Sequence, residues 1–314
     1  MTVPMKVDLR KEVAVVTGGG GILCGGMAKA LAECGARVAV TDLRLDGAEK
    51  IAGQIQAGGG KAAGFACNVL DKASLEQCNA EVEKTFGPVT LLVNGAGGNH
   101  PKGTTTREYL LPEDLKGAVE GVTTFYDLDP KGIEFVFNLN FLGTLLPTQV
   151  FTRAMAKAGR GCVVNISSMN AFTPLTKIPA YSGAKAAVSN FTQWLAVHFS
   201  KVGVRVNAIA PGFFLTDQNR SLLTREDGSL TPRGNTILDP YAPGPVWQRG
   251  GLDRRPALAV QPGGGGICDR NRDPCGRRLQ RLQRSLMEGR GGAAEGGPWQ
   301  REGSATGRRK GVET

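Results

Sequence analysis

Three side chains suited to proton transfer lie near one another in the sequence: Ser168, Tyr181 and Lys185. Tyr181 and Lys185 are four positions apart, so on a helix they lie one turn apart on the same face. A free tyrosine has a pKa of about 10, too high for a base at neutral pH, but a nearby ammonium group favours the phenolate. The pair therefore predicts a tyrosine that donates and accepts a proton beside a lysine that tunes it. Taken alone, the same spacing is also typical of a solvated helix face.

Ser168 lies thirteen positions before Tyr181, directly after the apolar segment 162–167. At the end of a strand, its hydroxyl can donate a hydrogen bond to a substrate oxygen on which negative charge develops. The three side chains together suit the reduction of a ketone or the reverse reaction, in which a proton moves at oxygen while a hydride moves at carbon.

The elements that must position these residues follow a regular alternation. Short β-branched and apolar runs, typical of strands buried on both faces, alternate with helix-length segments through residue 210. This alternation predicts a single-domain, doubly wound parallel sheet with right-handed crossovers, a Rossmann-like α/β fold. The expected strands are 12–17, 36–40, 61–66, 89–93, 162–167 and 204–209, and the expected helices include 25–34, 72–86 and 133–157.

The first of these units has the pattern of a dinucleotide site. A strand leads into the glycine run 18–21, a helix and a second strand that ends at Asp42. Glycines let the backbone approach a pyrophosphate, and the helix N-terminus favours its charge. A carboxylate at Asp42 would bind the adenosine ribose hydroxyls and repel a 2′-phosphate, which predicts NAD. Arg44 lies close by and keeps NADP open as an alternative.

Residues 99–132 interrupt the alternation with a polar, turn-rich stretch after the fourth expected strand. A long connection at the carboxyl edge of an open α/β sheet lies where such sheets bind ligands. We expect a substrate cover here, and a solvated surface excursion is the alternative.

Together these motifs resemble the short-chain dehydrogenase/reductase family over residues 8–238. The Ser and Tyr-x-x-x-Lys signature of that family matches Ser168, Tyr181 and Lys185. Its asparagine in an N-x-x-G segment matches Asn140, and the resemblance implies that Asn140 holds a water that passes protons to Lys185. The implied cofactor contacts are Gly18, Gly21, Ile22, Leu23, Asp42, Asn68, Val69, Asn94, Ala96, Gly97, Tyr181, Lys185, Pro211, Gly212 and Thr216.

The glycine turn departs from the family pattern. Where the family has T-G-x-x-x-G-x-G, this chain has Ile22 and Cys24 at the last two glycine positions. Extra glycines stand at 19–21 and 25–26. We therefore expect the loop to follow a somewhat different path.

Local phrases such as "NGAGGNHPK" and "NAIAPGFFLTDQNR" resemble the D-mannonate oxidoreductase (fructuronate reductase) branch of the family. That resemblance implies a six-carbon sugar acid as substrate and a homodimer or homotetramer as the assembly. Another family substrate, such as a gluconate, a polyol or a 3-oxoacyl thioester, is the alternative. Cations and amides suit the carboxylate and hydroxyls of a sugar acid. The substrate candidates are Asn99, His100, Asn170 and Arg220, with Lys177 as a further cation.

The bulk composition limits the remaining function classes. The net charge of +10 suggests a nucleic-acid partner, but residues 239–314 supply +6 of it, and that stretch lacks interleaved aromatics and any recognised binding module. Seven scattered cysteines without a C-x-x-C pair argue against a disulfide framework and a zinc site. No signal peptide and no membrane-spanning run is evident. We expect a cytoplasmic protein with neither metal, nucleic-acid nor membrane partner.

Residues 239–314 read differently from the rest of the chain. They hold 16 Gly, 13 Arg and 7 Pro but only 9 Leu, Ile, Val or Phe, a composition typical of disorder. Read one nucleotide later, permitted codons for residues 267–286 allow a strand, a V-D-G-G turn and a stop. We therefore expect a frameshift near codons 236–242 and a missing final strand. A catalytically defective, nucleotide-binding product is the alternative outcome.

Overall fold

A computed structural model describes residues 7–117, 119–212, 225 and 227–231 of the chain. The chain divides into two units, residues 1–267 and 268–314, and every described residue belongs to the first. The predictions for Thr216, Arg220 and the 239–314 segment lie outside the described residues.

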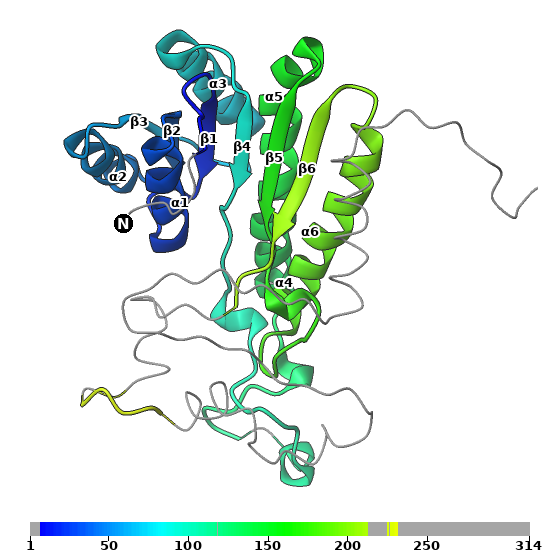
Figure 1. Cartoon of the computed structure of the whole chain (residues 1–314). Helices are drawn as coiled ribbons and strands as arrows, with labels where there is room; N and C mark the ends of the chain where they lie inside the picture. Colours follow the sequence, from blue (N-terminus) through cyan, green and yellow to red (C-terminus); the bar gives the residue numbers. More distant parts are fainter. Residues whose placement is uncertain (1–6, 118, 213–224, 226, 232–314) are drawn as a thin grey trace, which may run out of the picture. The chain divides into compact units, whose positions relative to one another are not determined.

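Six parallel strands form one sheet in the order β3-β2-β1-β4-β5-β6 (Figure 1). This order confirms the predicted doubly wound parallel sheet. The direction of winding reverses between β1 and β4, and open α/β sheets bind ligands outside the carboxyl ends of the strands at such a point. The strands are β1 (Val13–Thr17), β2 (Arg37–Asp42), β3 (Lys61–Ala66), β4 (Leu91–Asn94), β5 (Gly161–Ile166) and β6 (Val204–Ile209).

Helices pack on both faces of the sheet and bury two apolar clusters. One cluster joins α1 and α2 to one face, and the other joins α3, α5 and α6 to the opposite face. Leu75, Leu92 and Phe151 of the second cluster are fully buried. The helices are α1 (Ile22–Glu33), α2 (Leu45–Ala57), α3 (Lys72–Phe86), α4 (Pro130–Phe137), α5 (Gly143–Ala158) and α6 (Pro179–His198).

The helix expected over 133–157 is not regular. A π-helical turn, Asn138–Leu142, separates α4 from α5. Proline within α5 gives one physical reason, because Pro147 has no N–H to donate to the carbonyl four residues earlier. Single π-turns inside helices are frequently found at functional sites.

The segment 99–132 lies at the end of the sheet where the strands terminate (Figure 1). Its described part contains three short 3₁₀ turns, Pro101–Gly103, Pro112–Leu115 and Phe125–Asp127. It docks onto the loop that precedes α6, where the Thr105 N–H donates to the Lys177 carbonyl at 2.8 Å. The segment is therefore at the place expected of a substrate cover, and its role stays a prediction.

Within the described part of the chain, none of the helices combines the length and hydrophobicity that crossing a bilayer requires.

Replacing a side chain in the cluster under α3 should cost stability without touching the site. We expect Leu75→Ala to lower the free energy of unfolding by about 2–5 kcal/mol, because Leu75 is 0% exposed and the substitution leaves a cavity. Urea denaturation measures the change. Leu115→Ala is the matched control, since Leu115 is 63% exposed and the same deletion there should change little. Equal losses in the two variants would contradict the packing described.

Candidate active site

The glycine turn after β1 is locked against the end of β4. Gly18 has a φ of 64°, which favours glycine, and a Cβ at that position would lie 2.9 Å from the Cα of Ala96. The buried hydroxyl of Thr17 accepts hydrogen bonds from the N–H groups of Gly95 and Ala96, at 3.0 and 3.2 Å. Thr17 is absent from the predicted site. Its place at the strand end, just before the first glycine, is the signal that could have found it.

Asp42 closes the other side of the same turn. One carboxylate oxygen accepts from the Gly20 N–H at 3.1 Å, and the other accepts from the Arg44 N–H at 3.2 Å. These bonds fix the carboxylate at the carboxyl end of β2, beside the N-terminus of α1. The structure thus brings Gly18, Gly21 and Asp42 together as the dinucleotide pattern predicts, with Gly21 as the N-cap of α1.

Cys24, which departs from the family's glycine pattern, packs against the loop across the turn. Cys24 is buried on α1, and its Sγ lies against Gly95, where any side chain would collide with the sulfur. Burial raises the pKa of the Cys24 thiol to about 11, so the sulfur is a neutral packing group at neutral pH. The sulfur on the helix therefore occupies space that Gly95, on the facing loop, leaves free. Ile22 and Leu23 form the first turn of α1, and Ile22 is exposed.

Tyr181 and Lys185 lie on α6, as predicted, with Ser168 opposite them. The Lys185 Nζ is 5.7 Å from the centre of the Tyr181 ring and donates to the Ile166 carbonyl at 2.8 Å. Ser168 follows β5 and caps a short 3₁₀ turn, where its Oγ accepts from the Asn170 N–H at 3.2 Å. The three predicted proton-transfer residues are thus brought together at the carboxyl edge of the sheet.

Burial dominates the electrostatics of this group. Loss of water around its ammonium lowers the pKa of Lys185 to about 8. Burial also raises the pKa of Tyr181, while a hydrogen bond with Ser168 acts in the opposite direction. The sequence predicts a lowered tyrosine pKa, whereas the net shift of Tyr181 here is upward. The reason is that Tyr181 is itself desolvated, an effect that the spacing of Tyr181 and Lys185 cannot reveal.

Asn140 lies in the π-helical turn and is fully buried. Its side-chain amide donates to the carbonyls of Gly98 and Val136 at 2.7 and 2.8 Å, and its Oδ1 accepts from the Gly98 N–H at 3.3 Å. A Cβ at Gly97 would lie 2.7 Å from this Oδ1 and 3.2 Å from the Lys185 Nζ. The side chains of Asn140 and Lys185 therefore both lie against Gly97.

The remaining predicted cofactor residues differ in burial and in their hydrogen-bond partners. Asn94 is buried, and its Nδ2 donates to Thr148 and Asn165, so its amide holds β4 to its neighbours inside the protein. Asn68 is exposed and accepts from the Leu70 N–H, while Val69 is buried against Gly143. Pro211 and Gly212 follow β6, and the Pro211 carbonyl accepts from the Met169 N–H at 3.0 Å.

Two of the substrate candidates belong to the start of the 99–132 segment. The Asn99 amide donates to the Thr104 hydroxyl at 3.0 Å, and the His100 ring packs on Phe135 with centroids 5.0 Å apart. Asn170 differs, because it is 6% exposed and its Oδ1 has no partner among the described residues. An unpaired buried carbonyl is costly, so Asn170 is the candidate most in need of a ligand hydrogen bond.

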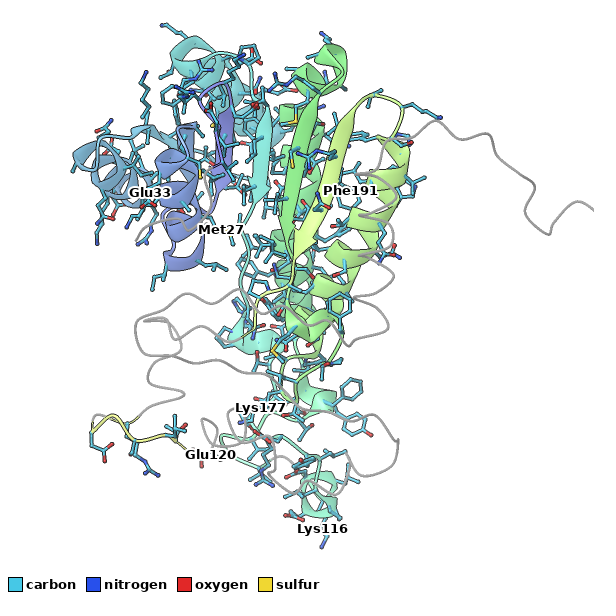
Figure 2. The ribbon with its side chains drawn as sticks, in the orientation of Figure 1. Met27, Glu33, Lys116, Glu120, Lys177 and Phe191 are labelled. Carbon is cyan, nitrogen blue, oxygen red and sulfur yellow. The ribbon has the colours of Figure 1, made fainter. Side chains whose placement is uncertain are left out.

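Lys177 is a further polar residue beyond the carboxyl ends of the strands. Figure 2 shows it beyond the strand ends, on the side of Lys116 and Glu120. Its φ of 72° makes it the one described non-glycine residue with a positive φ, and strained backbone of this kind clusters at functional sites. Among the described residues, no three His, Cys, Asp or Glu side chains gather as metal ligands would.

Comparisons with known proteins agree with this arrangement. A family model described as short chain dehydrogenase matches residues 12–227. A Haemophilus influenza protein provisionally assigned as a D-mannonate oxidoreductase, solved with NAD bound, is 52% identical, with a TM-score of 0.68 over 73% of this chain and 81% of that chain. UxuB of Bacillus subtilis, an uncharacterized oxidoreductase, is 45% identical over 75% of this chain and 83% of its own. A D-threitol dehydrogenase of Mycolicibacterium smegmatis is 32% identical over 76% of this chain and 81% of its own.

The buried ammonium should make Lys185 a destabilising residue. The native state releases its proton at about pH 8, and the unfolded chain near 10.5, so the unfolded state binds more protons between these values and stability rises with pH there. We expect Lys185→Met to raise the free energy of unfolding at pH 7 by roughly 3 kcal/mol at most, and the gain to shrink toward pH 10.

Urea denaturation at pH 7, 8.5 and 10 measures this dependence. Lys157→Met is the matched control, because Lys157 is exposed at the end of α5 and should show no such trend. A gain for Lys185→Met that is the same at all three pH values would contradict a desolvated ammonium.

Proposed function

The chain belongs to the short-chain dehydrogenase family, and from this membership we propose that it transfers a hydride between NAD and a sugar acid, interconverting D-fructuronate and D-mannonate. It is an oxidoreductase, and the proposal concerns its substrate. The observation that carries the proposal is the 52% identity to the NAD-bound protein provisionally assigned as a D-mannonate oxidoreductase.

The site residues are suited to this reaction. NAD supplies or accepts the hydride, and we assign its pyrophosphate and ribose to Gly18, Gly21 and Asp42. Tyr181 then gives a proton to the ketone oxygen, or takes one from the alcohol in the reverse direction. Ser168 donates a hydrogen bond to that oxygen and so stabilises the negative charge that develops on it. The hydrogen bond between Ser168 and Tyr181 in this structure supports this role.

Lys185 favours the ionised form of Tyr181 through its charge and binds the nicotinamide ribose hydroxyls. Its pKa of about 8 leaves most of the ammonium charged at neutral pH, so this electrostatic help is available there. Asn140 holds the water that returns protons to Lys185. Pro211, Gly212 and Thr216 complete the nicotinamide side of the pocket, and Asn68 and Val69 the adenine side.

Polar groups around the proton-transfer residues favour a polyhydroxy acid. The unpaired Oδ1 of Asn170, two residues from Ser168, is an acceptor for a substrate hydroxyl. Lys177 and Arg220 are the candidate cations for the carboxylate, and Asn99 and His100 contribute from the cover. A hydrocarbon or acyl substrate would leave Asn170 unpaired in a buried site, which is unfavourable.

A polyol is the second candidate substrate. It is supported by the 32% identity to a D-threitol dehydrogenase, which acts on a compound that has hydroxyls but no carboxylate. The two candidates differ in whether a cation is needed, so activity with a neutral polyol would favour this alternative.

We also infer that the chain assembles as a homodimer or homotetramer. The outer faces of α4 and α6 expose large apolar side chains, including Phe135 at 44%, Trp194 at 56% and Val197 at 67%. Figure 2 labels Phe191, which stacks on Trp194, on the same helix. Trp194 and Val197 are three residues apart on α6, and exposed apolar side chains on a shared helix face are typical of protein–protein contact.

We propose, finally, that residues 239–314 result from a shifted reading frame. The family match ends at residue 227, and about a quarter of the chain lies outside each reported alignment. In the described residues, β1 is buried along its whole length, whereas β6 exposes Arg205 and Ile209. β6 is an edge of the described sheet, and its mixed burial matches that of the other edge strand, β3, so the proposal rests on where the family match ends rather than on this exposure.

The substrate proposal can be tested by following NADH oxidation. We expect turnover with D-fructuronate to exceed turnover with 3-oxoacyl thioesters or neutral polyol-derived ketones. Tyr181→Phe should reduce kcat about 100-fold or more, because it removes the proton donor while keeping the ring. NADH binding, measured by fluorescence, should persist in this variant. Faster turnover of a neutral ketone would support the polyol alternative, and unchanged kcat in Tyr181→Phe would reject the mechanism.

The reading-frame proposal has two tests. Resequencing the DNA around codons 236–242 should reveal a one-nucleotide difference from the expected frame. A version with the frame restored should melt at a higher temperature than this chain, because an added strand and helix would bury apolar sheet surface worth about 25 cal/mol per Å². Equal melting temperatures and equal turnover of the two versions would oppose the proposal.

A further inference from the structure

A ladder of buried threonines runs along α5 and ends at Asn140. Thr144, Thr148 and Thr152 are spaced four residues apart, and each hydroxyl donates to the carbonyl four residues earlier, at 2.8, 2.7 and 2.5 Å. All three side chains are at most 3% exposed. Only the bond made by Thr144 reaches the π-helical turn, because its acceptor is the carbonyl of Asn140.

Asn140 is thereby held by its main chain as well as its side chain. The side-chain amide is bound to Gly98 and Val136, and the main-chain carbonyl is bound to the Thr144 hydroxyl. A π-turn disrupts the regular ladder of helix hydrogen bonds, so side chains must satisfy groups that a regular helix would pair itself. The Asn140 side chain, within the turn, and the Thr144 hydroxyl, just after it, both make such bonds.

The ladder also connects Asn140 to the helix that carries Lys185. Thr148 accepts from the Asn94 amide, which donates to Asn165 as well. The Asn165 amide donates in turn to Thr192 of α6 at 2.9 Å. These bonds are buried and cross β4 and β5, so they resist sliding of α5 against α6.

We propose that Thr144 is a positioning residue, whose hydroxyl keeps the π-helical turn in the form that aims Asn140 at Gly97 and Lys185. The inference rests on the proposed function for the roles of Asn140 and Lys185. Thr144 touches neither substrate nor cofactor in this proposal, and it acts through the carbonyl of Asn140. Releasing that carbonyl lets the turn relax toward a regular helix, which rotates Asn140 away from Gly98.

The chain contains its own matched control. Thr152 makes the same kind of hydrogen bond, on the same face of the same helix, with a side chain equally buried. It lies twelve residues from Asn140, which is about 18 Å along a helix. Thr144→Val and Thr152→Val remove the same hydroxyl from nearly identical settings, so a general loss of stability should affect both.

The experiment compares Thr144→Val, Thr144→Ser and Thr152→Val in the full chain. For Thr144→Val we expect kcat to fall about tenfold with the KM for NAD unchanged, because the loss of one buried hydrogen bond is concentrated at the proton-relay residue. Thr144→Ser should recover most of the rate, and Thr152→Val should match the wild type. Amide hydrogen exchange over residues 138–143 should speed up in Thr144→Val alone.

Two outcomes would overturn the inference. One is equal kcat and equal exchange over 138–143 in Thr144→Val and Thr152→Val, and the other is an equal loss in Thr144→Ser and Thr144→Val. If the wild-type chain turns over none of the sugar acids, the proposed function fails, but the exchange comparison still decides whether Thr144 holds the turn. A Thr144→Val protein that does not fold leaves the serine variant to decide, since a loss of exchange protection there would reject the hydroxyl's role.

Discussion

The buried ammonium of Lys185 is the constraint on which the site depends. Its side chain is 4% exposed, and its Nζ has the Ile166 carbonyl as its hydrogen-bond partner among the described residues. A charge so placed is costly to desolvate and remains only when the surrounding fold holds it there. In this protein α6 supplies the lysine, β5 supplies the carbonyl, and the Asn94–Gly97 loop passes close by. The fold thus holds the Lys185 ammonium next to Tyr181, in a place that is largely shielded from water.

The loop after β4 approaches Lys185 and α1 closely because two of its residues, Gly95 and Gly97, are glycines. At these positions the size of the side chain decides whether the loop fits. A side chain at Gly97 would collide with Asn140 and crowd Lys185, and one at Gly95 would collide with Cys24. At the second contact this chain has the larger residue, Cys24, on the helix and the glycine on the loop. Because Gly95 has no side chain, the Cys24 sulfur fits there, and α1 stays packed on the sheet with the altered motif.

The sequence predicted the parts of the molecule that local patterns determine. Apolar runs placed all six strands of the described sheet within two residues of their observed starts, and the spacing of Tyr181 and Lys185 placed both on one helix. It could not predict the π-helical turn or the inward-facing amide of Asn94, because both depend on partners far away in the chain. The upward shift of the Tyr181 pKa was missed for a related reason, since burial is a tertiary property. Thr144, Thr148 and Thr152 recur every four residues in the sequence. Only the structure shows that the Thr144 hydroxyl bonds to the Asn140 carbonyl.

The position of the site within the sheet indicates whether an altered C-terminal segment would impair stability or chemistry. Asn140, Ser168, Tyr181 and Lys185 all come from the chain between β4 and β6, and their side chains bond to partners within that region. The edge strand β6 exposes Arg205 and Ile209, and the Ile209 carbonyl accepts from the Ser167 N–H at 2.8 Å, next to Ser168. A lost cover over β6 would therefore weaken this edge of the sheet, whereas the side-chain bonds of Asn140, Tyr181 and Lys185 are made to residues outside β6. We infer that such a chain keeps its cofactor turn and its Tyr181–Lys185 pair, and that stability rather than chemistry limits it.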